Sequence, residues 1–373
     1  MTRAAADLAV PEVSVLRVEI LYTGGTFGMV EGGGGLRPRA GMGGEVADLV
    51  DAYTDRFGIP VEFRYTELDR VIDSANADPE TACRIARRVR AAIATTGPDG
   101  VTTGPDGVTT GPDGVTTGPD GVTTGPDGVI VIHGTDTMAY TGARLAFELH
   151  DIAVPVVLTG AQIPLGRPAS DAADNLMLAL NSIATQPAPG TFIAFGSSLH
   201  PAVRASKRSS DGYDGFTTVR PLTPPSMPPA RPAASPGVET PGPVGLFTVF
   251  PGMDSTLLDA ALRIYHGGVV LECYGAGTMP TSDDTVTAIR RATERGTPVV
   301  VITHCDSGTV DLGLYEPGRA LLAAGAIGGG DLTREAALAK LAHLAGLGLD
   351  ADEVRRWMTT NLVGELADPT SHQ

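Results

Sequence analysis

Short apolar runs alternate with amphipathic stretches along most of the chain. The apolar runs are typical of buried strands and lie at residues 16–22, 61–65, 129–133, 155–159, 191–195, 244–249, 268–272 and 298–303. The amphipathic stretches predict helices at 45–57, 79–94, 140–149, 170–184 (capped by Ser170), 257–265, 284–295, 320–324, 334–346 and 350–359. This alternation predicts an α/β fold whose mostly parallel sheet is covered by helices.

A change of composition divides the pattern into two parts. Residues 217–243 are rich in Pro, Ser and Thr, which is typical of an extended linker. We therefore predict a larger N-terminal catalytic α/β domain at 14–216, a linker at 217–243, and a smaller C-terminal α/β domain at 244–373.

A tandem repeat interrupts the N-terminal part. The heptad Thr-Thr-Gly-Pro-Asp-Gly-Val occurs five times without substitution between Thr95 and Val129. Each copy contains a turn signal and has little apolar surface to bury. We expect an expansion inserted as a surface loop at about 95–122, on the side of the sheet opposite the catalytic edge. An Asp-lined cation-binding array and a sequence artefact are the alternatives.

Charge and composition narrow the class of function. The chain has 27 basic and 43 acidic side chains, a net charge of −16, which argues against nucleic-acid or anionic-membrane partners. No aliphatic run is long enough to span a bilayer, and residues 1–11 show no export signal. The three cysteines are unpatterned, as in reduced thiols, so we expect a cytoplasmic protein.

Small and hydroxyl residues follow three of the predicted strands. These segments are Tyr22-Thr-Gly-Gly-Thr26, His133-Gly-Thr-Asp-Thr137 and Thr159-Gly-Ala-Gln162. Ligands of open parallel sheets bind beyond the carboxyl ends of strands. The sequence has no metal-ligand spacing, phosphate loop or dinucleotide fingerprint, which leaves threonine-based nucleophilic chemistry without a metal or cofactor.

Each motif also has a purely structural interpretation. Thr-Gly-Gly-Thr can be only a tight turn, and Asp136 can simply cap the following helix. His133 fits a supporting residue better than a general base. Lys207, taken alone, would be a solvated surface charge.

Taken together, these segments resemble the asparaginase/glutaminase family of amidohydrolases, and most closely its cytoplasmic type I branch. The resemblance covers most of the chain outside the repeat. It is carried by 21–29, 73–74, 128–138, 158–164, 170–175, 204–216, 274–277, 303–308 and 361–366.

The resemblance implies a catalytic set. Thr26 would be the primary nucleophile that attacks the side-chain amide and forms an acyl-enzyme. Thr135, Asp136 and Lys207 would form a second group that acts like a Ser-His-Asp relay. The lysine amine accepts a proton only when it is neutral, a state that burial favours. The order in which the two threonines act stays open.

The resemblance also implies how substrate is held. Ser74 and backbone groups from Asp73 through Ala75 would bind the α-carboxylate, and Asp136 the α-ammonium. Backbone N–H groups of Thr135 and Ala161 would serve as oxyanion donors. The implied substrate is free L-asparagine, with L-glutamine as the alternative, and the implied assembly is a homodimer or homotetramer.

Several positions depart from the family pattern. Leu36 stands where the glycine-rich lid at 28–44 often has a tyrosine, and Ala75 where a second polar residue is common. Thr278 replaces a frequent asparagine. Cys305 matches a residue that lines an allosteric pocket in some type I enzymes, but Glu272 replaces an arginine there, so allostery is not expected.

Two other functions fit the same residues. The first keeps the chemistry and changes the substrate, as a glutaminase or the ammonia-producing subunit of a tRNA-dependent amidotransferase. The acidic charge and the lack of an additional N-terminal domain argue against the tRNA-dependent version. The second is a catalytically weak amino-acid-binding protein, suggested by Leu36, Ala75 and the repeat.

Overall fold

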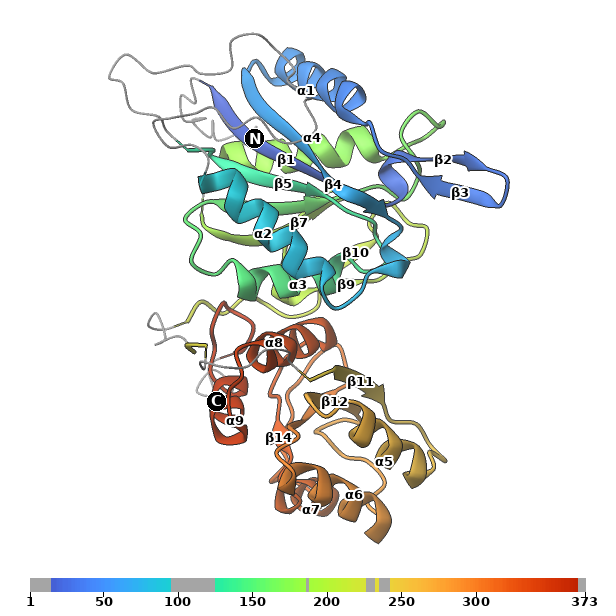
Figure 1. Cartoon of the computed structure of the whole chain (residues 1–373), viewed down its shortest axis with the longest axis vertical. Coiled ribbons are helices and arrows are strands. Elements are labelled where there is room, and N and C mark those ends of the chain that lie inside the picture. The colour runs from blue at the N-terminus through green and yellow to red at the C-terminus, as the bar shows by residue number, and fades with distance from the viewer. Residues whose placement is uncertain (1–14, 95–124, 186–187, 226–231, 235–241, 368–373) are drawn as a thin grey trace, which may run out of the picture. The chain divides into compact units, whose positions relative to one another are not determined.

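The computed structural model describes residues 15–94, 125–185, 188–225, 232–234 and 242–367 (Figure 1). Expectations for residues 1–11, for the repeat up to residue 124 and for much of the proposed linker fall outside these ranges. Contacts divide the chain into two compact units. Unit 1 comprises 1–138, 151–199 and 209–215, and unit 2 comprises 139–150, 200–208 and 216–373.

Unit 1 is built on a mostly parallel sheet. The strand order is β4-β1-β5-β6-β7-β8, with β4, β1, β5, β6 and β7 paired in parallel. The strands are β1 (Leu16–Gly24), β4 (Val61–Ile72), β5 (Gly128–Ile132), β6 (Pro155–Thr159), β7 (Gly190–Phe195) and β8 (Ser198–Pro201). β4 extends beyond the predicted 61–65. Its regular pairing with β1 continues to Glu67 and resumes at Ile72 after a bulge.

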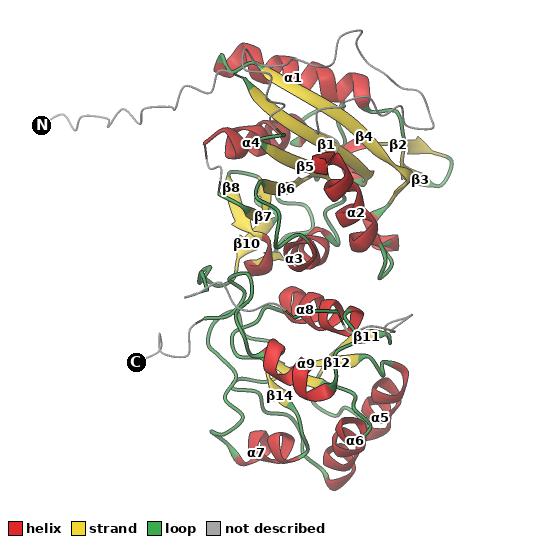
Figure 2. Ribbon diagram, turned by 60° about the vertical axis from the view of Figure 1, so that its left-hand side comes forward, coloured by secondary structure: helices red, strands yellow, loops and turns green. Residues whose placement is uncertain are grey.

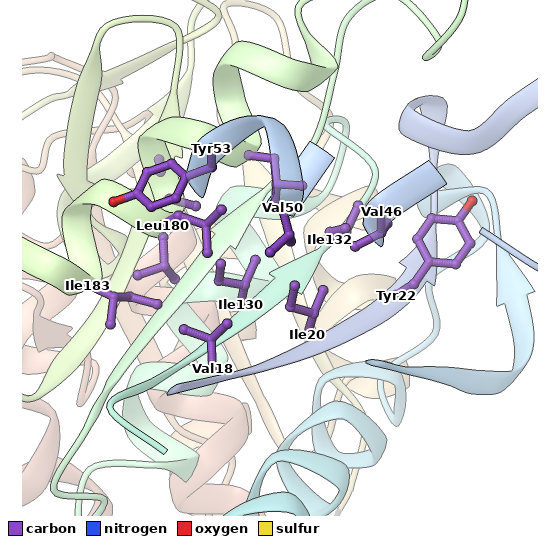
Figure 3. Packing of buried hydrophobic residues seen from close by; sticks show 14 of the residues in the cluster. Val18, Ile20, Tyr22, Val46, Val50, Tyr53, Ile130, Ile132, Leu180 and Ile183 are labelled. Carbon is purple, nitrogen blue, oxygen red and sulfur yellow. The ribbon is translucent and has the colours of Figure 1, made fainter. Parts of the chain in front are cut away.

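Helices cover both faces of this sheet. α1 (Gly43–Phe57) and α4 (Ala172–Thr185) pack on one face, while α2 (Thr81–Ala94) lies on the other (Figure 1). Figure 3 shows Val50 of α1 beside Ile130 and Val46 beside Ile132 of the central strand β5. Burial of these side chains holds α1 against the central strands.

An antiparallel hairpin follows the first motif. β2 (Met29–Gly32) and β3 (Gly35–Pro38) pair from Met29↔Pro38 to Gly32↔Gly35. The predicted glycine-rich lid therefore contains ordered strands joined by a two-residue Gly-Gly turn, a sequence that two-residue hairpins favour. The hairpin projects away from the sheet of unit 1 (Figure 2).

Unit 2 contains a smaller parallel sheet in the order β11-β12-β13-β14. Its strands are β11 (Val244–Thr248), β12 (Gly268–Cys273), β13 (Val299–Thr303) and β14 (Ile327–Gly328). Its helices are α3 (Met138–Glu148, whose first residue belongs to unit 1), α5 (Ser255–Ile264), α6 (Asp283–Glu294), α7 (Glu316–Ala323), α8 (Arg334–Gly346) and α9 (Ala351–Met358).

Residue alternation explains why both faces of this sheet are covered. Val269 and Val301 point into the core that contains α5, α6 and α7. Val270 and Val300 point into the core that contains α3, α8 and α9. Successive strand side chains face opposite ways, so strands that are apolar at every position need helices on both sides.

The expected fold class is confirmed, and the predicted helices and strands lie within a few residues of the observed ones. The two units are not continuous in the sequence as the predicted domains are. Contacts assign α3 and residues 200–208, which lie within the predicted N-terminal domain, to unit 2. Thr217 and Thr218, the first residues of the predicted linker, belong to β10 (Phe216–Thr218). No helix within the described ranges is both long and apolar enough to cross a membrane.

Candidate active site

Four loops of unit 1 meet at the carboxyl edge of its sheet through glycine contacts. A Cβ on Gly25 would lie 2.2 Å from Gly134 Cα, and one on Gly134 would lie 2.5 Å from Ser74 Oγ. A Cβ on Gly160 would lie 2.3 Å from the His133 carbonyl oxygen. No side chain fits these spaces, so the loops after β1, β5 and β6 touch through their backbones, and the loop after β4 touches Gly134 through the Ser74 side chain.

Thr26 begins the short 3-10 helix η1 (Thr26–Gly28), directly after the glycine turn. Its side chain is half-buried. The Gly25 N–H donates to the Ile72 carbonyl at 2.9 Å, and Gly25 adopts φ of +79°. The turn therefore needs glycine, and it presents Thr26 next to the loops that carry Ser74 and Thr135.

Thr135 lies immediately across the Gly25–Gly134 contact. It is 4% exposed, and its Oγ1 is 3.4 Å from Gln162 Oε1, a long contact. Two residues later, Thr137 Oγ1 donates to the Ser74 carbonyl at 3.0 Å. The structure thus brings the loops of Thr26, Ser74 and Thr135 together.

His133 is a buried supporting residue. It is 0% exposed, and its Nδ1 donates to the Gly134 carbonyl at 2.8 Å, since a carbonyl oxygen only accepts. Burial lowers the pKa of His133 to about 4, against the smaller opposing effect of that hydrogen bond. The side chain is therefore neutral near pH 7, in agreement with the supporting role predicted for it.

Gln162 and Asp171 are site residues for which the sequence predicted no role. Gln162 Nε2 donates to the Gly212 carbonyl at 3.1 Å, which ties the Thr135 region to the loop at 209–215. Asp171 accepts N–H bonds from Gln162 and Ile163, each at 2.9 Å. Asp171 is 7% exposed, so it holds the Ala161–Gln162 turn in place. The available signal was the polar Gln162 at a strand end.

The proposed carboxylate-binding segment forms the short 3-10 helix η2 (Ser74–Asn76). Ser74 is 3% exposed, and Ala161 across the site is fully buried. Asp73 caps η2 by accepting the Ala75 N–H at 3.1 Å. This N–H, one of the backbone groups expected to bind substrate, is therefore already used within the loop.

The remaining two predicted catalytic residues belong to different units. Asp136 follows Thr135 in unit 1 and is exposed in the single chain. Lys207 is half-buried and ends β9 (Ala205–Lys207) in unit 2, where it pairs with Phe216 of β10. The approach of Lys207 to Asp136 therefore stays a prediction.

A polar cavity in unit 2 contains Lys207. Its volume is about 330 Å³, and it is lined by Tyr140, Ser206, Lys207, Val219, Arg220, Glu272, Thr303, His304, Cys305, Asp306, Thr333, Arg334 and Glu335. Ser206 donates to Glu335 at 2.7 Å, and Glu272 accepts from Arg334 Nε at 2.8 Å. The first bond ties the strand that presents Lys207 to α8, and the second ties α8 to β12.

A buried arginine also supports that strand. Arg204, just before β9, is 0% exposed and donates to the Gly364 and Asp331 carbonyls at 3.1 and 3.0 Å. It also pairs with the Asp331 carboxylate at 3.1 Å. The C-terminal segment of unit 2 is thus packed against the base of the Lys207 strand.

Comparison with known proteins agrees with this arrangement. Residues 120–224 match the model of the N-terminal asparaginase domain, and residues 243–358 match that of the glutaminase/asparaginase C-terminal domain. L-asparaginase 1 of Escherichia coli K12 is 32% identical over 361 residues, which cover 94% of this chain and 97% of that protein.

A solved structure and a more distant relative extend the comparison. The crystal structure of L-asparaginase I from Vibrio cholerae matches with a TM-score of 0.72 and 29% identity, over 95% of this chain and all of that one. One subunit of the glutamyl-tRNA(Gln) amidotransferase of Aeropyrum pernix is 36% identical over 263 residues, which span 64% of this chain and 61% of that protein.

The fold and the threonine-bearing loops define an amidohydrolase-type α/β protein. With the near-full-length similarity, the chain belongs to the asparaginase family of enzymes and resembles its bacterial type I members, as the motifs predicted.

Proposed function

We propose that the protein hydrolyses the side-chain amide of free L-asparagine to L-aspartate and ammonia through a covalent threonine ester. The observation that carries the proposal is the backbone contact between Gly25 and Gly134, which sets the Thr26 and Thr135 loops side by side. The similarity to proteins named L-asparaginase supports the choice of substrate.

In the first half-reaction, Thr26 Oγ attacks the carboxamide carbon. Thr26 gives up its hydroxyl proton, the C–N bond breaks, the amide nitrogen gains that proton and leaves as ammonia, and a β-aspartyl ester remains on Thr26. Backbone N–H groups of Thr135 and Ala161 stabilise the oxyanion, a role suited to preorganised donors in a buried site. Both residues are almost completely buried, which supports this assignment.

In the second half-reaction, water attacks the ester carbon. Thr135, Asp136 and Lys207 remove a proton from that water, the ester C–O bond breaks, and Thr26 regains its hydrogen. L-aspartate is released with both its main-chain charges intact. This step needs Lys207 to lie near Asp136.

Selection of a free amino acid comes from reading both main-chain charges. The Ser74 hydroxyl and neighbouring backbone bind the α-carboxylate, and Asp136 binds the α-ammonium. An asparagine inside a peptide lacks both charges, so it leaves Asp136 without its partner. We therefore expect free asparagine to be preferred over asparagine within a peptide.

An ammonia-release assay tests the proposal. The wild-type chain should release ammonia from L-asparagine, and Thr26→Ala and Thr135→Ala should each lower kcat at least about 10³-fold, as removal of a member of a nucleophile–base set does. Thr66→Ala, on an exposed position of β4, is the matched control and should keep full activity. Full activity in either site variant would refute the assignment.

A second substrate is favoured by one specific observation. The amidotransferase relative matches the chain at 36% identity, so glutamine amide hydrolysis within such a complex fits the same chemistry. Comparing kcat/KM for free L-asparagine and L-glutamine separates the two. A higher kcat/KM for glutamine would transfer the proposal to this substrate.

Two related expectations accompany the proposal. A catalytically weak amino-acid-binding protein would show tight asparagine binding in calorimetry without product, and hydrolysis at ordinary enzymatic rates excludes it. We also keep the expectation of a cytoplasmic homodimer or homotetramer, which sedimentation of the purified chain tests for the oligomeric state.

A further inference from the structure

Glu67 holds the returning limb of the β2–β3 hairpin. Its carboxylate accepts the Gly41 N–H at 2.9 Å and the Met42 N–H at 2.9 Å. The Tyr65 hydroxyl donates to the same carboxylate at 2.5 Å. Gly41 and Met42 lie in the segment that connects β3 to α1. The Glu67 side chain therefore fixes the point where the hairpin rejoins the body of unit 1.

The first limb of the hairpin begins directly after the loop that carries Thr26. It meets the returning limb at Met42, in the segment that Glu67 binds. A Cβ on Gly28 would lie 2.2 Å from the Tyr22 hydroxyl and 3.0 Å from Met42 Sδ. Tyr22 is also the register partner of Glu67 between β1 and β4. The two limbs therefore pack together over the sheet edge, and only Phe27 separates Thr26 from the contact at Gly28.

The strength of attachment differs along the hairpin. Beyond its base, the hairpin contacts the loop after β6 through a pair between Glu31 and Arg167, both exposed side chains. Exposed ion pairs contribute little free energy. Bonds from several backbone N–H groups to one carboxylate are stronger, since charge-assisted hydrogen bonds exceed neutral ones. The geometry thus combines a firmly held base with a weakly held outer part.

We propose that Glu67 is a positioning residue for substrate retention: by bonding the Gly41–Met42 segment it keeps the hairpin base in the arrangement from which the hairpin closes over the site at Thr26. The inference rests on the proposed function, because it assigns the hairpin to the asparagine site. Glu67 touches neither Thr26 nor substrate, and it acts through the position of the hairpin.

Loss of the carboxylate should therefore lower the population of the closed hairpin. A smaller competent fraction raises the apparent dissociation constant by the same factor. For Glu67→Ala we expect KM for L-asparagine to rise about tenfold while kcat stays within about threefold of wild type, because saturating substrate restores closure. Glu67→Gln keeps one acceptor oxygen and should show an intermediate rise in KM.

Limited trypsin digestion gives a readout that does not depend on turnover. Arg39 precedes Ala40 in the returning limb, which makes the 39–40 bond a cleavage site. We expect cleavage there to be at least about fivefold faster in Glu67→Ala than in wild type, since the less stable segment opens more often. Added L-aspartate should protect wild type more than the variant.

Asp69→Asn is the matched control. Asp69 lies on the same strand two residues away, and its exposed carboxylate pairs with Arg88 rather than with the hairpin. This variant should keep wild-type KM and wild-type cleavage.

The alternative is that Glu67 only stabilises the start of α1, which has no side-chain cap of its own. That role would lower the unfolding temperature of Glu67→Ala without changing KM or the cleavage rate. Wild-type values for KM and cleavage in Glu67→Ala would overturn the inference, whatever the unfolding temperature. A wild-type chain inactive on asparagine would refute the proposed function, while the digestion would still decide the role of Glu67 at the hairpin base.

Discussion

At the scale of single residues, Glu148 shows how the charge of one side chain contributes to stability. It lies at the end of α3, where its Oε1 is 2.8 Å from Arg144 Nε and 2.9 Å from His343 Nδ1. Burial acts to raise the pKa of Glu148, but the bonds and charges of His343 and Arg144 outweigh burial and lower it to about 2. The folded state thus favours the charged carboxylate.

The sign of the pH dependence follows from this lowered pKa. The unfolded chain binds a proton at Glu148 near the ordinary value of 4.5, whereas the folded chain does so only near 2. The stabilisation is therefore complete above about pH 4.5 and is lost as the pH falls toward 2. Glu148→Gln should lower the free energy of unfolding by about 1–3 kcal/mol at pH 7, a deficit that should shrink below pH 4.5.

Urea unfolding of both proteins across this pH range measures the effect. Glu62→Gln is the control, because Glu62 forms an exposed pair with Arg17 and should change stability by less than about 1 kcal/mol. If the free energy of unfolding of Glu148→Gln stays below that of wild type by the same amount from pH 7 to pH 2.5, the destabilisation comes from lost packing and not from the lost charge.

At the scale of elements, the contact between the β1 and β5 loops is the most demanding feature of the site. A methyl group on Gly25 would lie 2.2 Å from Gly134 Cα, far inside van der Waals contact, and the φ of +79° adds strain. Gly25→Ala should separate the two loops and lower kcat/KM at least about 100-fold, because displacements near 1 Å cost this much in catalysis.

Gly44→Ala is the control for this substitution. Gly44 is exposed in α1, outside the hairpin, where an added Cβ meets no atom within 4 Å. Asparagine hydrolysis by both variants, with circular dichroism to establish folding, makes the comparison. Normal activity in Gly25→Ala would mean that asparagine hydrolysis does not depend on the close contact between the Thr26 and Thr135 loops.

The elements also show what the sequence predicts well. The aliphatic runs of β5 and β13 and the amphipathic pattern of α6 predict their positions within a residue or two, because burial on a sheet or helix face leaves a clear periodic signal. The hairpin at 29–38 was missed, since its exposed glycine-rich strands have no buried face to produce a pattern.

For the site, the sequence predicts residues better than contacts. Thr26, Ser74 and Thr135 were expected together, and their loops do meet. The roles of Gln162, Asp171 and Glu67 were not foreseen, because each depends on hydrogen bonds to backbone groups that are distant in the sequence. Such bonds leave no local pattern in the chain.

At the scale of the whole molecule, the described end of the heptad repeat leads into the unit 1 sheet at the edge away from the site. Its last copy leads into β5 at Gly128, which pairs with Val18 near the start of β1. In this copy, Asp127 accepts the Arg17 N–H at 2.7 Å, so one turn has a structural role. Thr26 and Thr135 follow the opposite ends of these strands.

Deletion of residues 95–122, four complete heptads, should therefore leave kcat and KM for asparagine within about twofold of wild type. Shortening a loop by this much changes closure entropy by only about 1–2 kcal/mol. The kinetics and the unfolding temperature of the deletion variant test this. A large loss of turnover in a variant that remains folded would show that the repeat influences the site.

The proposed catalytic set is divided between the two units, with Thr26 and Thr135 in unit 1 and Lys207 in unit 2, and the covalent step is the decisive point. A Lys207→Met variant removes the proposed proton acceptor and keeps both hydroxyls. Mass spectrometry of this variant, acid-quenched during reaction with L-asparagine and digested, should find a β-aspartyl ester on the peptide that contains Thr26. An ester on the Thr135 peptide instead would contradict the account.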